Sequence, residues 1–153
     1  ITTDTQTGTR ALWRSDRLRK LFLTFAEPGQ VGLSSIGSLL SPTTREDNNG
    51  LVIDIDPTAK EFKKLMAPIA PGLFEPVAIT NYEPISINQK CVLDNSVGTL
   101  AYDGEREVTV FSGDRIEIAL DRRGPRTIDM TKTIENIAYS GLLINDDALQ
   151  SRR

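Results

Sequence analysis

The chain has 153 residues, of which 39% are hydrophobic and 25% are charged, so it is long enough to build one hydrophobic core. Its 18 basic and 21 acidic side chains leave a net charge of −3, which argues against a nucleic-acid partner. The chain has no histidine and a single cysteine, Cys91, which excludes a histidine base and an intrachain disulfide and argues against a metal site. No apolar run approaches the length of a membrane span, so we expect no membrane partner. The lone cysteine favours a cytoplasmic location.

The first patterned stretch, Leu12–Phe25, is ambiguous between a basic amphipathic helix and a strand. We favour a strand for its second half, Lys20–Phe25, because this run leads directly into the Pro28-Gly29 turn. The polar stretch Ser41–Gly50 follows as an insertion that ends in turn residues.

Short runs rich in Val, Ile, Thr, Phe and Tyr then alternate with Gly, Pro, Asn and Asp, which is typical of many short strands rather than of βαβ units. In the last two runs apolar residues alternate with others, as half-buried antiparallel strands require, and Ser112-Gly113-Asp114 between them has the length of a hairpin connector. The clearest predicted strands are Leu51–Ile55, Val77–Thr80, Thr99–Tyr102, Glu107–Phe111 and Ile116–Leu120.

Near the C-terminus the spacing changes to that of a helix. Ile134, Ile137 and Ala138 recur at three- and four-residue intervals within Thr131–Ser140, and Gly141 is a natural helix end. Leu12–Phe25 is the one other stretch that competes as a helix. We therefore predict one mainly β domain over residues 1–153, sandwich-like, with a C-terminal helix.

One segment has a composition suited to nucleotide contact. Glu27–Ser38 contains three glycines and three serines around two large apolar residues. Glycines let a backbone approach a ligand closely, and serine hydroxyls with exposed N–H groups suit ribose or phosphate oxygens. The segment lacks the lysine of a P-loop, so from composition alone an ordinary Gly/Ser turn explains it as well.

Two further segments are unusual. Lys64–Phe74 carries Pro68 and Pro71, which cannot lie in a central strand, so we expect a rigid edge or loop that serves either as a packed connector or as a ligand wall. Asp103-Gly104 follows a predicted strand and indicates a hairpin turn whose carboxylate could also hold a hydroxyl. Other aspartates lie in similar turns, so the pattern alone selects none of them.

The order of these segments resembles the second domain of the ATP-NAD kinase superfamily, in the branch typified by the acetoin-catabolism protein AcoX. The resemblance covers Trp13 to Gly141. It rests on a Pro-Gly-x-Val-Gly-Leu-Ser loop, an Ala-Pro-Ile-Ala-Pro-Gly segment, an Asp-Gly-Glu-Arg-Glu turn and a Gly-Pro-x-x-x-Asp stretch before a closing helix. Here these stand at Pro28–Ser34, Ala67–Gly72, Asp103–Glu107 and Gly124–Asp129.

The resemblance implies a set of nucleotide-contacting residues, because the Gly-Ser segment of this domain contacts the dinucleotide in the family. The implied residues are Gly32, Ser34, Ser35, Gly37 and Ser38, with Asp103 and Gly104 at the family turn. It also implies that the chain is the C-terminal half of a longer protein, closing over an upstream α/β domain with the nucleotide between them. That parent would phosphorylate NAD(H) or a related small molecule with ATP and Mg²⁺.

The catalytic aspartate of the family belongs to a Gly-Gly-Asp-Gly loop of the upstream domain, and that motif is absent here. We therefore expect no catalytic residue in this chain, no tightly bound cofactor, and no activity of the chain alone. We also expect a homo-oligomer, because Leu39-Leu40, Ile69 and Leu73-Phe74 would leave apolar surface exposed near the ligand side.

Two alternatives stand beside this reading. Gly72 replaces a histidine of typical NAD kinases, and Leu33–Leu40 lacks their tyrosine, which favours a non-catalytic nucleotide-binding or regulatory module. The other alternative is a free-standing β-sandwich adaptor.

Overall fold

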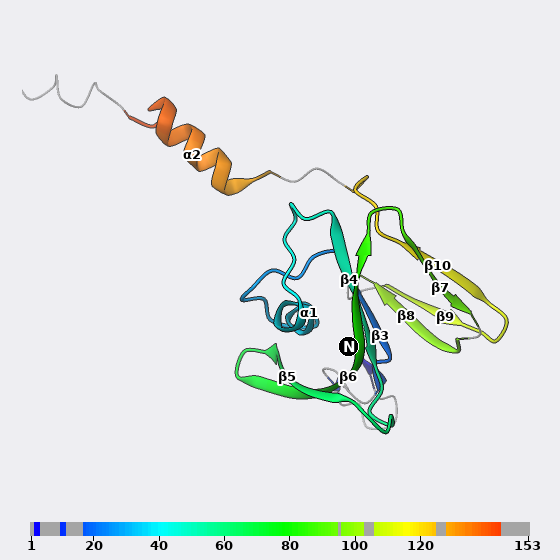
Figure 1. Ribbon diagram of the computed structural model, residues 1–153. Helices are drawn as coiled ribbons and strands as arrows, with labels where there is room; N and C mark the ends of the chain where they lie inside the picture. Colours follow the sequence, from blue (N-terminus) through cyan, green and yellow to red (C-terminus); the bar gives the residue numbers. More distant parts are fainter. Residues whose placement is uncertain are drawn as a thin grey trace, which may run out of the picture. The chain divides into compact units, whose positions relative to one another are not determined.

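A computed structural model gives the arrangement of the chain (Figure 1). It describes residues 2–3, 10–11, 17–94, 96–102, 106–124 and 128–144, and only the backbone of residues 2, 3, 10 and 11. The chain divides into two compact units, Ile1–Arg122 and Arg123–Arg153. The elements of the first unit are β1 (Thr2–Thr3), β2 (Arg10–Ala11), β3 (Lys20–Leu23), α1 (Ser34–Leu40), β4 (Asn49–Ile55), β5 (Lys63–Ala70), β6 (Leu73–Ser86), β7 (Lys90–Asp94), β8 (Gly98–Tyr102), β9 (Arg106–Val110) and β10 (Arg115–Ala119). The second unit contains α2 (Met130–Ser140).

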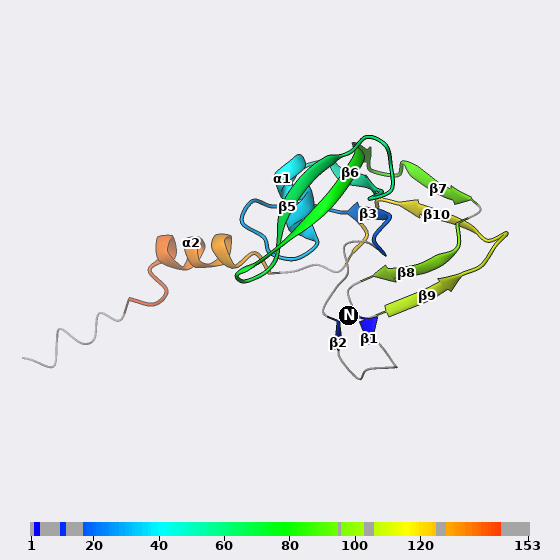
Figure 2. The ribbon, with the colours of Figure 1, turned by 90° about the horizontal axis from the view of Figure 1, so that it is seen from below.

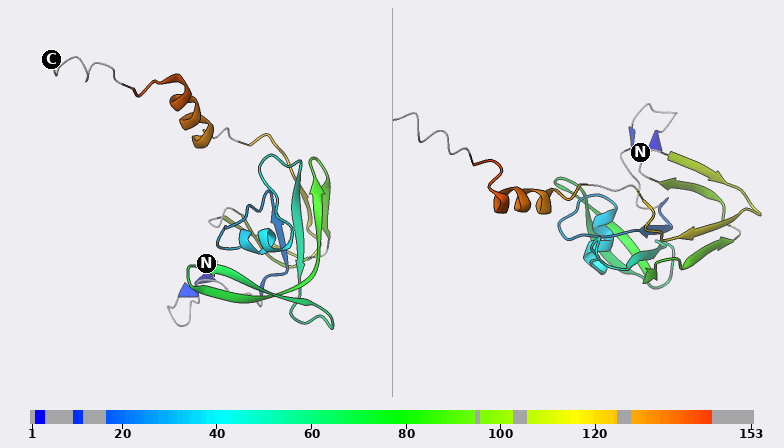
Figure 3. Two further views of the ribbon diagram at one scale, coloured as in Figure 1. Left: turned by 60° about the vertical axis from the view of Figure 1, so that its left-hand side comes forward. Right: turned by 90° about the horizontal axis from the view of Figure 1, so that it is seen from above.

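A four-stranded antiparallel sheet in the order β3-β4-β6-β5 forms the centre of the first unit. Alternation along β4 sends Leu51, Ile53 and Ile55 to one face, where they pack with Ile36 of α1 in a core that excludes solvent. Burying each of these side chains contributes about 1.5–3 kcal/mol. The pair β7–β10 lies on the side of the sheet opposite α1 (Figures 1 and 3).

The long strand β6 accommodates two prolines. Its first half pairs with β5, where Pro76 stands opposite Met66, and its second half pairs with β4, where Pro84 stands opposite Leu51. Each proline therefore has a neighbouring strand on one side only, and the missing N–H interrupts no central ladder. β5 is an edge strand, as the prolines of Lys64–Phe74 predicted, and Pro71-Gly72 forms its hairpin turn with Gly72 at a φ of +75°.

Helix α1 contradicts the interpretation of Glu27–Ser38 as turn structure throughout, because no helix was expected in this segment. Serine and glycine favour helices weakly, so the sequence carries no helix pattern there. Packing overrides that preference. Ile36 is fully buried, and a Cβ on Gly37 would clash with Cδ1 of Leu23 and lie 2.9 Å from Cβ of Ala26, so any larger residue at this position would force its neighbours to shift.

The hairpin expected between the last two strands is also wrong. β9 pairs with β8, and β10 pairs with β7, so residues 111–114 connect two different sheets. The registers of the two ladders differ by one residue, which places an extra residue on the β9–β10 side of one long, bent hairpin (Figure 2). Asp114 holds the bend, because its carboxylate accepts the N–H of Phe111 at 2.8 Å. From the sequence of a three-residue connector, a tight hairpin turn and a bulge cannot be told apart.

The other predicted elements are confirmed within two residues, and these include the Lys20–Phe25 strand, observed as β3. Val77–Thr80 is part of the longer β6. α2 begins one residue before the predicted Thr131 and ends at Gly141, whose φ of +65° closes the helix. The prediction of a mainly β chain with antiparallel sheets and a C-terminal helix is confirmed. Among the described residues, no helix has both the length and the apolar character needed to cross a membrane.

Candidate functional site

The Gly-Ser segment, Glu27–Ser38, follows β3 as a loop and continues into α1. Ala26 and Thr43 exchange backbone hydrogen bonds of 2.9 and 3.1 Å, which close the base of this excursion. Gly29 and Gly32 have φ angles of +83° and +98°, a conformation that L side chains rarely adopt, and nothing lies within 4 Å of where their Cβ atoms would be. The loop is therefore shaped by its glycines and open along one side.

The Gly-Ser segment and the proline-rich segment Lys64–Phe74 come together at one carbonyl group, that of Pro68. The N–H of Gly32 donates to the carbonyl oxygen of Pro68 at 3.0 Å. The Ser35 hydroxyl donates to the Gly32 carbonyl at 2.6 Å and approaches the Pro68 carbonyl at 3.3 Å. The Gly-Ser segment is thus fastened to the edge strand β5, although the two segments are more than thirty residues apart. No local sequence signal identifies Pro68 as the acceptor.

The residues implied by the resemblance differ in what they offer to a ligand. Ser35 and Gly37 are buried, and the Ser38 hydroxyl donates to the Ser35 carbonyl at 3.0 Å. Gly32 and Ser34 are half-buried at the junction of loop and helix. Asp103 and Gly104 lie outside the described residues, in the sequence between β8 and β9.

Gln30, which sequence reasoning did not select, carries an unsatisfied group in the same loop. Its Oε1 atom is buried and has no hydrogen-bond partner within the described part of the chain. A buried acceptor without a partner costs about 1–3 kcal/mol, so a further donor at this position would be stabilising. At the base of the loop, the Arg45 guanidinium stacks 4.8 Å from the ring centre of Phe25 and lies 3.7 Å from Glu27.

The carboxylates with shifted pKa values serve turns and ion pairs. The backbone N–H of Thr44 lowers the pKa of Asp47, and the hydroxyl and N–H of Thr58 lower the pKa of Asp56. The Lys90 ammonium, at 2.8 Å, lowers the pKa of Glu117. These shifts favour ionised, structural carboxylates over a general acid, which needs a raised pKa. Within the described ranges no three His, Cys, Asp or Glu side chains are grouped so as to hold a metal ion.

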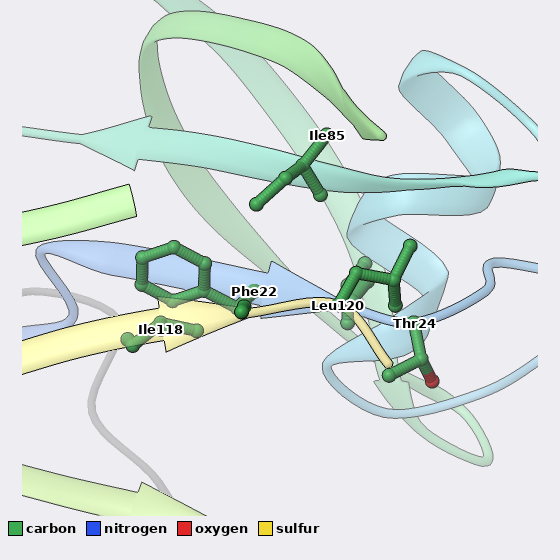
Figure 4. A pocket seen from close by; sticks show the side chains of 7 residues that line it. Phe22, Thr24, Ile85, Ile118 and Leu120 are labelled. Atoms are coloured by element: carbon green, nitrogen blue, oxygen red, sulfur yellow. The ribbon is translucent and has the colours of Figure 1, made fainter. Parts of the chain in front are cut away.

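The described part of the chain also has a small apolar pocket between the central sheet and β10 (Figure 4). Phe22 and Ile85 line it from the sheet, Ile118 and Leu120 line it from the β10 side, and Thr24 lies at its end. Its volume of about 60 Å³ is far below the roughly 300–1,000 Å³ of small-molecule sites. The pocket does not accommodate a nucleotide and is separate from the Gly-Ser segment.

Comparison with known proteins gives two findings. The family model of the acetoin catabolism protein X C-terminal domain matches residues 1–123. Acetoin catabolism protein X of Cupriavidus necator is 35% identical to this chain over 136 residues, which are 89% of this chain and 38% of the relative. The chain thus spans well under half the length of that protein. No solved structure matches.

Proposed function

Because the chain belongs to the acetoin catabolism protein X C-terminal domain family, we propose that it is the nucleotide-contacting and oligomerising domain of such a protein. The parent protein phosphorylates NAD(H) or a related small molecule with ATP. The Gly-Ser segment forms one wall of the nucleotide site, and an upstream α/β domain of the same polypeptide forms the other. The 38% share of the relative that this chain covers is consistent with such a domain.

The observation that carries the proposal is the hydrogen bond from Gly32 to the Pro68 carbonyl, 3.0 Å long. It joins the Gly-Ser segment, whose composition suits nucleotide contact, to the proline-rich segment, which was expected to be a packed connector or a ligand wall, and it fixes the loop without using the open side at Gly29 and Gly32. A preorganised backbone loses less entropy when a ligand binds.

Burial and side-chain hydrogen bonds divide the proposed residues by role. Gly32 and Ser34 contact the ligand, because they lie partly exposed at the end of the loop. Ser35, Gly37 and Ser38 position the loop, since their groups are packed or hydrogen-bonded within the domain. Gln30 fits a ligand that brings a donor, such as a ribose hydroxyl, to its unpartnered Oε1.

The phosphoryl chemistry itself is assigned to the parent. ATP supplies the phosphoryl group, and Mg²⁺ neutralises its developing charge. The Gly-Ser segment offers backbone N–H and hydroxyl groups, which suit phosphate and ribose oxygens, but no cluster of carboxylates for the ion. This chain therefore binds and orients the nucleotide, and by itself transfers no phosphoryl group.

Isothermal titration of the full-length parent with NAD, NADH and ATP tests the binding. We expect Ser34→Ala to weaken NAD binding by about two- to tenfold, the loss of one neutral hydrogen bond. Ser112→Ala is the matched control, because Ser112 is an exposed serine between β9 and β10, outside the Gly-Ser segment, and its change should leave affinity unchanged. Absence of binding of all three ligands at millimolar concentration would overturn the proposal.

Asp103 and Gly104 are proposed as the turn that faces the nucleotide. Asp103→Ala should weaken nucleotide binding by the parent about ten- to hundredfold through loss of a charge-assisted hydrogen bond to a ribose hydroxyl, with an unchanged melting temperature. An unchanged dissociation constant with a lowered melting temperature removes both residues from the site, because it identifies a carboxylate that stabilises its own turn.

A non-catalytic nucleotide-binding module is the second candidate. Gly72 favours it, because this residue is the hairpin turn of β5 and β6, where a φ of +75° disfavours the histidine that typical NAD kinases carry there. This candidate predicts nucleotide binding without transfer of labelled phosphate from ATP to NAD by the parent. The two functions are separated by that one assay.

Oligomerisation is proposed from exposed apolar side chains of α1 and the β5–β6 hairpin. Leu39, Leu73 and Phe74 are 52%, 40% and 58% exposed, whereas Leu40 and Ile69, which were also expected to be exposed, pack against the core. We expect sedimentation velocity to report a dimer or larger assembly of the chain. A monomer at millimolar concentration would contradict this part of the proposal.

A further inference from the structure

The polar stretch Ser41–Gly50 leaves α1 and returns to the start of the Gly-Ser segment before the chain enters β4. Thr43 lies within this stretch and exchanges two backbone hydrogen bonds with Ala26, and the Thr43 hydroxyl also accepts the Ala26 N–H at 3.0 Å. Both residues are buried, whereas residues 44–48 are exposed. The exposed part is therefore a loop that directly follows the base of the Gly-Ser segment.

The exposed loop is closed by Asp47. The Asp47 carboxylate accepts the backbone N–H of Thr44 at 2.6 Å and the Thr44 hydroxyl at 3.0 Å. The Asp47 N–H donates in return to the Thr44 carbonyl at 3.3 Å. A short polar side chain that bonds the backbone in this way stabilises a turn. Arg45 lies inside the turn, so its backbone is restrained on both sides.

Arg122, the last residue of the first unit, attaches the same turn to the rest of that unit. Its Nη2 atom donates to the carbonyl oxygen of Asp47 at 2.5 Å and to that of Glu46 at 3.3 Å. Hydrogen bonds from a charged donor are stronger than those between neutral groups. The turn that carries Arg45 is therefore held independently of the Gly-Ser segment.

Arg45 contacts the two residues that flank Ala26. Its guanidinium lies 4.8 Å from the centre of the Phe25 ring, and its Nε atom lies 3.7 Å from Oε1 of Glu27, the first residue of the Gly-Ser segment. A guanidinium can stack on an aromatic ring and pair with a carboxylate at the same time, because it is planar and always charged. Arg45 thus adds a side-chain attachment to the backbone hydrogen bonds at the base of the segment.

The contacts of Arg45 act locally. Its side chain is 61% exposed, and ion pairs and cation–π contacts at exposed sites contribute little to the stability of a fold. They restrain one end of a segment whose other end is held by the hydrogen bond between Gly32 and Pro68. Residues 28–31 lie between these two attachments, so their conformation depends on both.

We propose that Arg45 is a positioning residue of the nucleotide site, which holds the start of the Gly-Ser segment while Pro68 holds its end. A loop that is restrained at both ends loses less entropy when a ligand binds, so loss of one restraint weakens binding without removing a ligand contact. The effect on nucleotide binding rests on the proposed function, whereas the effect on the loop can be measured in the ligand-free chain.

Hydrogen exchange of the 153-residue chain, followed by NMR at the Gly32 amide, tests the restraint. We expect Arg45→Ala to speed this exchange about two- to fivefold, the factor that corresponds to one exposed cation–π contact, with an unchanged unfolding midpoint. Arg45→Lys keeps the positive charge and should recover part of the protection. Arg115→Ala is the matched control, because the Arg115 side chain is also 61% exposed and lies 3.7 Å from a carboxylate of the β7–β10 pair, so its loss should not affect Gly32.

Titration of the full-length parent with NAD tests the consequence for binding. Arg45→Ala should weaken NAD binding by the same two- to fivefold, about the effect of the lost restraint, and Arg115→Ala should leave it unchanged. If the wild-type parent binds no NAD while Arg45→Ala still speeds Gly32 exchange, the proposed function fails and Arg45 remains the residue that holds the segment.

Four results would overturn the proposal. Wild-type exchange of Gly32 in Arg45→Ala means that the contacts do not restrain the segment. Faster exchange at all protected amides, with a lowered unfolding midpoint, identifies a general stabilising residue. Equal exchange in Arg45→Ala and Arg45→Lys means that the charge does not hold the loop. Faster Gly32 exchange with unchanged NAD affinity means that the shape of the loop does not limit binding.

Discussion

The two helices of this chain are stabilised in different ways. α1 has seven residues, Ser-Ser-Ile-Gly-Ser-Leu-Leu, no side-chain cap at its start, and three fully or nearly fully buried residues. α2 has 11 residues, an aspartate cap from Asp129, a glycine end at Gly141 and no buried residue. α1 is thus defined by what surrounds it, and α2 by signals in its own sequence. The difference separates helices that tertiary packing creates from helices that the chain specifies locally.

The largest effect on stability is expected from replacing an isoleucine of α1 by alanine, and the same replacement in α2 should have almost none. Ile36→Ala should lower the free energy of unfolding of the chain by about 2–5 kcal/mol, because it leaves a cavity between α1 and β4. Ile134→Ala, with a side chain that is 55% exposed, should change it by no more than about 0.5 kcal/mol. Urea denaturation measures both. Equal effects would show that α2 is packed in the isolated chain.

A second substitution tests the close approach of α1. Gly37→Val should destabilise the chain by about 1–3 kcal/mol, because the new Cβ would clash with Leu23 Cδ1 and lie 2.9 Å from Ala26 Cβ. Gly124→Val is the control, since nothing lies within 4 Å of the position of its Cβ. Thermal unfolding of both variants compares them, and a neutral Gly37→Val would show that β3 and α1 separate at low cost.

The hydroxyl of Ser35 should matter to stability as well. Ser35→Ala removes the hydroxyl that donates to the Gly32 carbonyl, while the Gly32 and Pro68 carbonyls each keep a backbone N–H donor, so we expect a loss of about 0.5–1.5 kcal/mol in urea denaturation. If the loss is instead confined to ligand affinity of the parent, then Ser35 contacts nucleotide directly and its role as a positioning residue is wrong.

The smallest effect concerns the cap of α2. The N–H of Lys132 donates to Asp129 at 3.0 Å and holds the pKa of that carboxyl below its usual value. A lowered pKa in the folded state means that the cap stabilises α2 above pH about 4 and that this stabilisation is lost as the pH falls through the folded pKa. Carbon chemical shifts of residues 130–140 should therefore report less helix on acidification. Asp129→Asn, which caps without titrating, should remove the part of this change that Asp129 causes.

The sequence predicted those parts of the fold whose signals are local. The alternation Ile116-Glu117-Ile118 and the spacing of Ile134, Ile137 and Ala138 each predicted an element correctly. α1 was missed because burial of Ile36 and contact with Leu23 are set by residues distant in sequence. The pairing of β9 with β8 agrees with the hairpin turn that Asp103-Gly104 indicated, whereas the pairing of β10 with β7 was missed because period-2 patterns identify a strand but not its partner.

In the candidate site, too, the sequence predicted what depends on local signals and missed what depends on tertiary packing. Composition selected the Gly-Ser and proline-rich segments, and the structure shows them joined at Pro68. Composition did not tell which serine hydroxyls face outward, because that depends on how α1 is rotated against the sheet. Ser34 and Ser35 are adjacent in sequence, yet one is half-buried and the other fully buried.

The bond between Gly32 and Pro68 also has a consequence for solubility. β5 is an outer strand, and a bare outer strand is a template on which other chains can grow as fibrils. At Pro68 this template is closed twice, because proline has no N–H to offer and its carbonyl is already occupied by Gly32. Lys63 and Lys64 place positive charge at the other end of the strand. The loop proposed to hold nucleotide thereby also protects the edge of β5 against aggregation. Variants in which this loop detaches from β5 should become insoluble even where nucleotide binding is retained.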